Sequence, residues 1–346
     1  MKALVKYESG PGHMEIRDIP RPQPGPEQVL IKIVEAGICG SDLHIYHSDI
    51  AIPVRPPVVT GHEFSGIIEE VGEHVSGFKP GDRVVSETAY HYCGQCDFCR
   101  EGWYNLCVER KTLGYWYNGV FTNYTVVPAG RLHHLPDQVS FTAGAMCEPL
   151  ACVTHAIEDL CRIVPGDVVL VSGPGSIGLM ATQVAKAHGA TVILSGTDID
   201  SQRLRTAREL GADYAVNIQQ EDLTALVMKM TRGYGADVVL ECSGSGLAID
   251  SALNLIKKRG WFCQIGLPGK KIEFDIEKIC FKELHFAGSL GSRHTSWKKA
   301  LAFLKSGQIS LEQLATHKLP ISRWEEAFSL FENKQGIKIM MLPEKE

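Results

Sequence analysis

The hydrophobic positions of the chain follow two different patterns, with a change near residue 165. In the first 150 residues, short apolar runs rich in Val and Ile are separated by turn signals such as Gly81-Asp82. We expect strands at residues 1–7, 29–34, 67–71, 83–86 and 124–127. Short strands at close intervals predict a β-rich domain with long loops.

After Pro165-Gly166-Asp167, apolar runs of strand length alternate with segments of helical periodicity. We expect strands at residues 168–171, 191–195, 236–241 and 261–266, and helices at residues 177–188, 201–210 and 248–258. This alternation predicts a parallel, doubly wound sheet with helices on both faces. From about residue 290 the pattern loosens, and we expect the final strand, residues 338–341, to pack on the first domain.

Length and charge limit the possible functions. The chain has 346 residues, enough for two domains, and its net charge of -5 argues against nucleic-acid binding, which usually needs a basic surface. The start lacks the apolar core of a signal peptide, and no apolar run reaches the roughly 18 residues that span a membrane. We therefore expect a cytoplasmic protein with neither a nucleic-acid nor a membrane partner.

Four of the eleven cysteines are spaced as metal ligands in the pattern C-x2-C-x2-C-x7-C. They are Cys93, Cys96, Cys99 and Cys107. Four thiolates at this spacing can surround one zinc ion, whereas the last gap is too long for the bacterial ferredoxin pattern of an iron-sulfur cluster. The spacing predicts a structural zinc in a lobe at residues 90–110. Apart from Cys39, the remaining cysteines occur singly, and we expect them to be small core residues.

A second set of metal-binding side chains comes from distant segments. Cys39 lies in Cys39-Gly40-Ser41-Asp42-Leu43-His44, His62 and Glu63 lie in a Gly-His-Glu segment, and Glu148 begins Glu148-Pro149-Leu150. Each is weak alone, because a single cysteine or a His-Glu pair is more often structural. Together they supply a thiolate, an imidazole and one or two carboxylates, the composition of a catalytic zinc site with an open position.

A glycine-rich motif, Gly173-Pro174-Gly175-Ser176-Ile177-Gly178, follows the expected strand at 168–171 and opens a helix. In that context G-x-G-x-x-G binds the pyrophosphate of a dinucleotide. Asp198, 25 residues after Gly173, is placed to bind the adenosine ribose, and its charge favours NAD over NADP. The alternative is that Asp198 caps the next helix, a role for which Asp200 and Ser201 also compete.

These motifs occur in an order that resembles the zinc-containing medium-chain dehydrogenase/reductase family. The resemblance covers essentially the whole chain. It implies a GroES-like catalytic domain (residues 1–152 and 290–346), a Rossmann NAD-binding domain (residues 153–289), and a homodimer or homotetramer formed by edge pairing of the cofactor-domain sheets. Relatives without catalytic zinc, such as crystallins and quinone reductases, would be binding or structural proteins, but here the ligand set is complete.

Carried over residue by residue, the resemblance assigns Cys39, His62 and Glu63 to the catalytic zinc. Glu148 would be either a fourth ligand or a contact to water and substrate. Ser41 and His44 match the proton relay, in which zinc lowers the pKa of the alcohol, the Ser41 hydroxyl accepts the proton and His44 passes it to solvent. The alternative for these two residues is a turn hydroxyl and a surface histidine.

The family pattern also places Arg203 along the ribose or adenine of the cofactor, which leaves some tolerance for NADP.

The Glu148-Pro149-Leu150 segment resembles sorbitol and other polyol dehydrogenases, some of whose relatives use phosphorylated substrates. L-threonine 3-dehydrogenase is the competitor, but Glu148 departs from its pattern. In the polar loop at residues 291–296 we expect Arg293 to contact a substrate hydroxyl or phosphate, unless it is a solvated loop arginine. The carboxylate ligands leave some room for manganese or cobalt in place of catalytic zinc.

Overall fold

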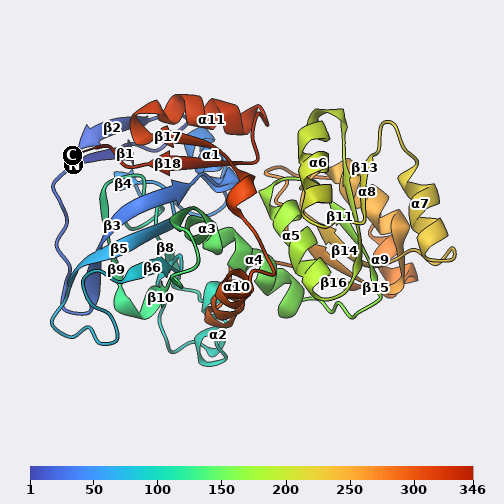
Figure 1. Cartoon of the computed structure of the whole chain (residues 1–346), viewed down its shortest axis with the longest axis horizontal. Coiled ribbons are helices and arrows are strands. Elements are labelled where there is room, and N and C mark those ends of the chain that lie inside the picture. The colour runs from blue at the N-terminus through green and yellow to red at the C-terminus, as the bar shows by residue number, and fades with distance from the viewer. Residues whose placement is uncertain (346) are drawn as a thin grey trace. The chain divides into compact units, whose positions relative to one another are not determined.

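The computed structural model describes residues 1–345, which divide into two compact units (Figure 1). The first unit contains residues 1–149, 292–305 and the chain from residue 311 onward, and the second contains residues 150–291 and 306–310. The first unit is rich in antiparallel strands and the second contains a parallel sheet covered by helices. The predicted fold class is therefore confirmed.

The first unit is built on a seven-stranded sheet in the order β10-β6-β5-β3-β18-β17, with β9 paired to β3. A three-stranded sheet, β2-β1-β4, and the pair β7-β8 complete the strands of this unit. Their bounds are β1 (Lys2–Lys6), β2 (Met14–Asp18), β3 (Gln28–Gly37), β4 (Val58–Val59), β5 (Glu63–Val71), β6 (Arg83–Ser86), β7 (Ala89–His91), β8 (Lys111–Thr112), β9 (Tyr124–Pro128), β10 (Leu132–His134), β17 (Ala315–Pro320) and β18 (Lys338–Leu342).

The long central strand β3 determines where the functional residues lie. Its apolar side chains, including Val29, Ile31 and Ile33, are buried in the hydrophobic core of the unit. Strand β5 pairs with β3 in antiparallel register, with Gly37 opposite Glu63. The end of β3 and the start of β5 therefore lie side by side, at the point where the predicted metal ligands occur.

Helices in the first unit include two that the sequence analysis missed, α10 (His294–Ser306) and α11 (Trp324–Glu332). In α10, Trp297, Ala300, Leu301 and Leu304 are buried, a spacing typical of one helix face. A helical periodicity of apolar residues is thus present beyond residue 290, although the polar residues on either side of these positions masked it. The other helices are α1 (Gly40–His47), α2 (Asp97–Arg100), α3 (Phe141–Ala145) and α4 (Cys147–Glu158), which continues into the second unit.

The second unit contains a six-stranded parallel sheet in the order β13-β12-β11-β14-β15-β16. Numbered by appearance within the unit, this is the order 3-2-1-4-5-6 of dinucleotide-binding folds. Helices α5 and α6 cover one face, and α7, α8 and α9 cover the other (Figure 1). The bounds are β11 (Val168–Ser172), α5 (Ser176–Ala187), β12 (Thr191–Gly196), α6 (Ser201–Glu209), β13 (Tyr214–Asn217), α7 (Leu223–Met230), β14 (Ala236–Glu241), α8 (Gly246–Leu255), β15 (Ile256–Gln264), α9 (Glu277–Phe281) and β16 (His285–Gly288).

One expected boundary is wrong. The sequence analysis extended a helix to residue 258 and began the next strand at 261, but α8 ends at Leu255 and β15 begins at Ile256. Ile256 is extended and buried, and it pairs with Ala236 of β14. Burial and pairing in the sheet therefore override the helical propensity of the two lysines that follow.

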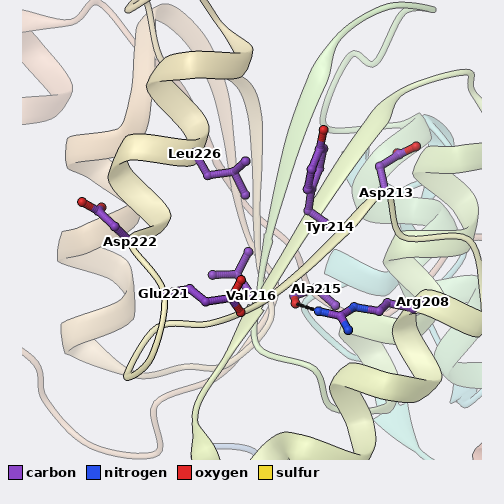
Figure 2. A pocket seen from close by; sticks show the side chains of 8 residues that line it. All are labelled: Arg208, Asp213, Tyr214, Ala215, Val216, Glu221, Asp222 and Leu226. Atoms are coloured by element: carbon purple, nitrogen blue, oxygen red, sulfur yellow. Dashed lines mark hydrogen bonds between the residues drawn. The ribbon is translucent and has the colours of Figure 1, made fainter.

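Strand β13 forms one edge of this sheet, beside a surface cavity of about 410 Å³ (Figure 2). The guanidinium of Arg208 donates to the main-chain carbonyl oxygen of Ala215 at 2.9 Å, and Glu221 and Leu226 line the side toward α7. Arg208 thus satisfies a backbone acceptor on a strand that has one neighbour.

Across the described residues 1–345, no helix combines the length and apolarity needed to cross a membrane.

Candidate active site

Cys39, His62 and Glu63 lie together in the first unit. One potential ligand atom from each residue lies within 4.8 Å of the other two. The pairing of β3 with β5 explains this arrangement, because Cys39 follows Gly37 at the end of β3 and Gly37 is opposite Glu63. Residues 23 positions apart are thereby brought to one point, as the sequence analysis expected from their types alone.

The imidazole of His62 is buried, and its two nitrogens face different partners. Nδ1 lies 3.7 Å from a carboxylate oxygen of Asp42, and Nε2 lies 3.5 Å from the hydroxyl oxygen of Ser41. Burial alone would lower the pKa of His62, but the charge of Asp42, the hydrogen bond and charge of Cys39 and the charge of Glu148 raise it to about 10. The acidic groups around the imidazole therefore favour a positive charge at this site.

Glu63 has a partner that the sequence analysis did not identify. The ammonium group of Lys338, on β18, forms an ion pair with Glu63 Oε2, and both side chains are about 1% exposed. Burial alone would lower the pKa of Lys338, but the charges of Glu63 and Cys39 raise it, so the lysine stays charged. The apolar strand pattern at residues 338–341 hid this lysine, because it is a buried polar residue at the start of that strand.

The donor set fits a zinc ion. Glu63 Oε1 is buried and has no hydrogen-bond partner among the described residues. A buried carboxylate oxygen without a donor is costly unless a cation neutralises it. One thiolate, one imidazole and one carboxylate at this spacing are the ligand types that zinc prefers, and Asp42 beside Nδ1 leaves Nε2 of His62 for the metal.

Ser41 and His44 both lie on α1, three residues apart and hence on the same helix face. His44 Nδ1 is 2.8 Å from Asp49 Oδ1, and the His44 side chain is about one-third exposed. It is therefore paired with a carboxylate and still reaches solvent. Glu148 is buried at the start of α4, and its charge acts on His62 and Lys338. The group of mutually close ligand atoms contains Cys39, His62 and Glu63, which favours Glu148 as a neighbour of the metal ligands.

The four lobe cysteines also come together. Cys93 Sγ lies 3.9 Å from Cys99 Sγ and 3.6 Å from Cys107 Sγ, and the backbone N–H of Cys96 donates to Cys93 Sγ at 3.3 Å. Hydrogen bonds from the backbone N–H groups of Gln95 and Cys96 lower the pKa of Cys93 to about 7. The lobe therefore stabilises a thiolate, as a zinc ligand requires.

Of the single cysteines that the sequence analysis expected in the core, Cys280 is exposed on α9, which contradicts that expectation.

A third cluster, not predicted, joins α10 to the strand region around Glu87. Glu87 Oε1 lies 2.9 Å from His133 Nε2 and 2.8 Å from His294 Nδ1, while Oε2 accepts from Arg131 and Tyr104. Burial alone would raise the pKa of Glu87, but the two histidine hydrogen bonds and the charge of Arg131 lower it to about 2. These distances are those of hydrogen bonds, so the cluster fastens α10 to this region.

Arg293, just before α10, contacts the cysteine lobe. Its Nε donates to the carbonyl oxygen of Gly102 at 3.1 Å, and its guanidinium stacks 3.9 Å from the ring centroid of Trp103. These contacts give Arg293 a structural role in the lobe. The predicted contact with a substrate hydroxyl or phosphate stays a prediction.

In the second unit, the glycines of the motif differ in their surroundings. A Cβ on Gly178 would lie 1.9 Å from the carbonyl oxygen of Gly173, so the helix packs closely on the turn. A Cβ on Gly175 would meet nothing within 4 Å, which leaves open space at the start of α5. Ile177 lies in the first turn of that helix, whose N-terminal N–H groups have no side-chain cap from Gly175. An anion such as a pyrophosphate suits this position.

Asp198 follows β12 and is exposed. Its Oδ1 accepts hydrogen bonds from the side-chain amides of Asn217 at 2.6 Å and Gln220 at 2.7 Å. Asp200, by contrast, occupies the N-cap position of α6, the place that had been the alternative for Asp198, but it makes no side-chain cap hydrogen bond there and accepts from the hydroxyl and the backbone N–H of Thr197. Arg203, expected along the ribose or adenine, has Nη1 3.3 Å from Asp200 Oδ1.

Comparison with known proteins agrees with this geometry. The alcohol dehydrogenase GroES-like domain matches residues 25–137, and the zinc-binding dehydrogenase domain matches residues 176–306. The chain is 46% identical to a sorbitol dehydrogenase of Halalkalibacterium halodurans, over 99% of both chains. It is 41% identical to a D-arabitol-phosphate dehydrogenase of Enterococcus avium, over 99% of this chain and 97% of the relative. An L-threonine 3-dehydrogenase of Symbiobacterium thermophilum is 36% identical, over 99% and 98%.

Solved structures of similar proteins contain either nicotinamide cofactor. A zinc-binding dehydrogenase of Sinorhizobium meliloti bound to NADP has a TM-score of 0.88 and 31% identity, with 99% of each chain covered. An Escherichia coli CFT073 protein described as a short chain alcohol dehydrogenase, complexed with NADH, has a TM-score of 0.88 and 30% identity, also over 99% of each chain. The fold is therefore shared with proteins that bind NAD(H) or NADP.

Proposed function

The chain belongs to the family of zinc-binding alcohol dehydrogenases with a GroES-like domain, and from that premise we propose that it oxidises a secondary hydroxyl of a polyol or polyol phosphate to the ketose. The observation that carries this proposal is the buried donor set of Cys39, His62 and Glu63 beside the Ser41 hydroxyl. A closed structural zinc site offers no group to take a proton, whereas this set has one next to it. We therefore propose that the protein is an enzyme rather than a binding or structural protein.

When bound, zinc would lower the pKa of the substrate alcohol, and the nicotinamide would take the hydride from its carbon. Cys39, His62 and Glu63 would hold the metal, and the carboxylate of Asp42 lies 3.7 Å from His62 Nδ1, which leaves Nε2 for the metal. Ser41 Oγ takes the hydroxyl proton of the substrate as its own proton leaves toward His44. His44, paired with Asp49 and partly exposed, releases a proton to solvent. One alcohol and one oxidised cofactor thus give one ketone, one reduced cofactor and one proton.

The substrate class rests on the relatives. The sorbitol and arabitol-phosphate dehydrogenases share 46% and 41% of their aligned residues with this chain, whereas the L-threonine dehydrogenase shares 36%. Glu148, whose charge reaches the metal ligand His62, departs from the pattern of the threonine enzymes. Both points support a polyol over an amino acid.

For the cofactor we propose NAD. A carboxylate beside the adenosine ribose pairs with the 2′-hydroxyl and repels a 2′-phosphate. Asp198 has the expected place after β12, and two side-chain amides hold its Oδ1 in position. Gly173, Gly175, Ile177 and Gly178 would hold the pyrophosphate, with Arg203 near the ribose or adenine.

We also propose a cytoplasmic homodimer or homotetramer. The free thiols of the lobe fit a reducing compartment. Strand β16 is an edge strand in the described residues, and Phe286 on it is 39% exposed, which supports pairing through this edge. Light scattering on the purified protein measures the subunit number directly.

The test of function is the rate of NADH formation with sorbitol, xylitol, ribitol, arabitol, their phosphates and L-threonine, on protein of measured zinc content. A rate with a polyol or polyol phosphate that exceeds all others supports the proposal. A rate with threonine alone would replace the substrate and leave the cofactor and metal assignments intact. Absence of NADH and NADPH formation with every substrate would refute the enzyme proposal.

A further inference from the structure

Glu87, His133 and His294 form a group of potential metal ligands that shares no residue with the two clusters predicted from the sequence. Glu87 follows β6, His133 lies on β10 and His294 begins α10, and all three belong to the first unit. One potential ligand atom from each residue lies within 4.8 Å of the other two. Two imidazoles and one carboxylate are a protein ligand set that zinc accepts, with a further position left for water.

The carboxylate of Glu87 is held in one orientation. Its Oε2 accepts hydrogen bonds from the hydroxyl of Tyr104 and the guanidinium of Arg131, and the side chain is only 2% exposed. Hydrogen bonds to the far oxygen of a carboxylate are a common way to fix that carboxylate toward a metal ion. Oε1 is thereby directed at the two histidines.

The two imidazoles differ in their freedom to move. The ring of His133 is buried and stacks on the indole of Trp297, with an angle of 3° between the planes and 5.4 Å between the ring centroids. This packing keeps His133 Nε2 beside Glu87. The side chain of His294 is 44% exposed, so a metal ion and a water ligand can reach the group from solvent on its side.

The spacing of the ligand atoms is close to that of a zinc site. Glu87 Oε1 lies 2.9 Å from His133 Nε2 and 2.8 Å from His294 Nδ1. Around a tetrahedral zinc ion with bonds of about 2.0–2.2 Å, ligand atoms lie about 3.3–3.5 Å apart, so an outward shift of about half an ångström suffices. Without a metal these atoms form hydrogen bonds. With a metal each imidazole offers a lone pair instead, and its proton leaves or moves to the other ring nitrogen.

We propose that Glu87 Oε1, His133 Nε2 and His294 Nδ1 form a third metal site, which binds a zinc ion and ties α10 to β10 and to the end of β6. The site goes beyond the proposed function and does not depend on it. The positive charge of Arg131 beside Glu87 opposes a cation, so this site binds zinc more weakly than the four-cysteine lobe. It fills when free zinc is supplied and empties when free zinc is removed.

The experiment compares the wild type with His294→Ala, each isolated with its resident zinc. Both are dialysed to equilibrium against zinc buffers of rising free concentration, and bound zinc is measured by mass spectrometry. We expect the wild type to take up one more ion per chain, and the affinity for that ion to fall at least about a hundredfold in His294→Ala. Equal uptake by the two proteins, or no extra ion in the wild type, would overturn the proposal and leave the cluster a hydrogen-bond network.

Two further variants separate this site from surface binding and from misfolding. His74→Ala is the matched control, because His74 and Glu73 form an exposed histidine–carboxylate pair at 3.6 Å, and it should take up zinc as the wild type does. His294→Gln keeps a side chain that can hydrogen-bond to Glu87 but has no imidazole. It should also lose the extra ion, and a folded His294→Gln that retains the ion contradicts the proposal.

Thermal unfolding gives a second readout of the same ion. Added zinc should raise the melting temperature of the wild type, because the ion binds the folded state, and should raise that of His294→Gln much less. An equal rise in both proteins would count against the site. Since zinc content and melting temperature are measured without a substrate, a protein inactive on every alcohol would refute the proposed function and leave this inference standing.

Discussion

Lys338 and Glu63 form a buried ion pair, although the two residues lie 275 positions apart in the sequence. The pair occupies space that Gly37 leaves open, because a Cβ there would lie 2.5 Å from Glu63 Oε2 and 2.8 Å from Lys338 Cε. One oxygen of the Glu63 carboxylate, which we propose as a metal ligand, is thus paired with a lysine of the C-terminal strand. The last strand of the fold therefore contributes a charged side chain to the candidate metal site.

Replacing Lys338 with Met should destabilise the metal-free protein more than the zinc-loaded protein. Without the ammonium group, Glu63 is a buried charge with no counter-ion, a change that typically costs about 3–5 kcal/mol. Bound zinc would supply the missing positive charge. Thermal unfolding with and without a chelator measures both states, with Lys318→Met as a control at an exposed ion pair. Equal destabilisation in both states would contradict this account.

The Glu87 cluster predicts a specific dependence of stability on pH. The pKa of Glu87 is lowered to about 2 in the folded protein, below the ordinary value of 4.5, so the folded state favours the carboxylate. Its contribution is fully present above about pH 4.5 and is lost as the pH falls toward 2. The free energy of unfolding should therefore fall less steeply between these values in Glu87→Gln than in the wild type. Denaturant unfolding at a series of pH values tests this, and parallel curves would argue against it.

Much of the site could be predicted because its chemistry is carried by residue types with few other uses. Four cysteines at metal-binding spacing, and glycines after a buried strand, have a limited range of structural explanations. The antiparallel register of β3 and β5, which the sequence analysis did not predict, then brings together Cys39 and His62.

The residues that were missed are those whose role depends on distant packing. Lys338 looks like the polar start of a strand, and Tyr115 looks like an aromatic residue in a turn. Their positions beside Glu63 and His62 depend on contacts between segments 275 and 53 residues apart along the chain. No local periodicity encodes such contacts. The stacking of the Arg293 guanidinium on Trp103 was missed for the same reason, and the predicted contact of Arg293 with a substrate stays a prediction.

A lobe variant should lose one zinc ion and keep the other. Cys96→Ser removes one thiolate from a closed four-cysteine site, whereas the donor set at Cys39 is unaffected. We expect the zinc content to fall from about two ions per chain to about one, with a lower melting temperature because the lobe loses its cross-link. Cys280→Ser, at an exposed lone cysteine, is the control and should retain both ions. Metal analysis by mass spectrometry decides between these outcomes.

The choice of cofactor should depend on Asp198 and on the amides that hold it. Asp198→Ala removes the carboxylate that would pair with the ribose of NAD and repel the phosphate of NADP. We expect the ratio of kcat/KM for NAD to that for NADP to fall at least tenfold, which corresponds to about 1.4 kcal/mol. Glu209→Ala, at an exposed position on helix α6, which follows Asp198 in the chain, is the control and should leave the ratio unchanged.

Asn217→Ala gives a finer test, because it leaves the charge of Asp198 in place and removes one of the two amides that fix its Oδ1. If fixed orientation matters, the KM for NAD should rise severalfold while kcat stays constant, since the adenosine ribose is remote from the reacting carbon. Repulsion of the NADP phosphate depends on charge and should persist. A variant that gained NADP activity would therefore mean that Asn217 itself discriminates between the cofactors, and that Asp198 does not act through its charge alone.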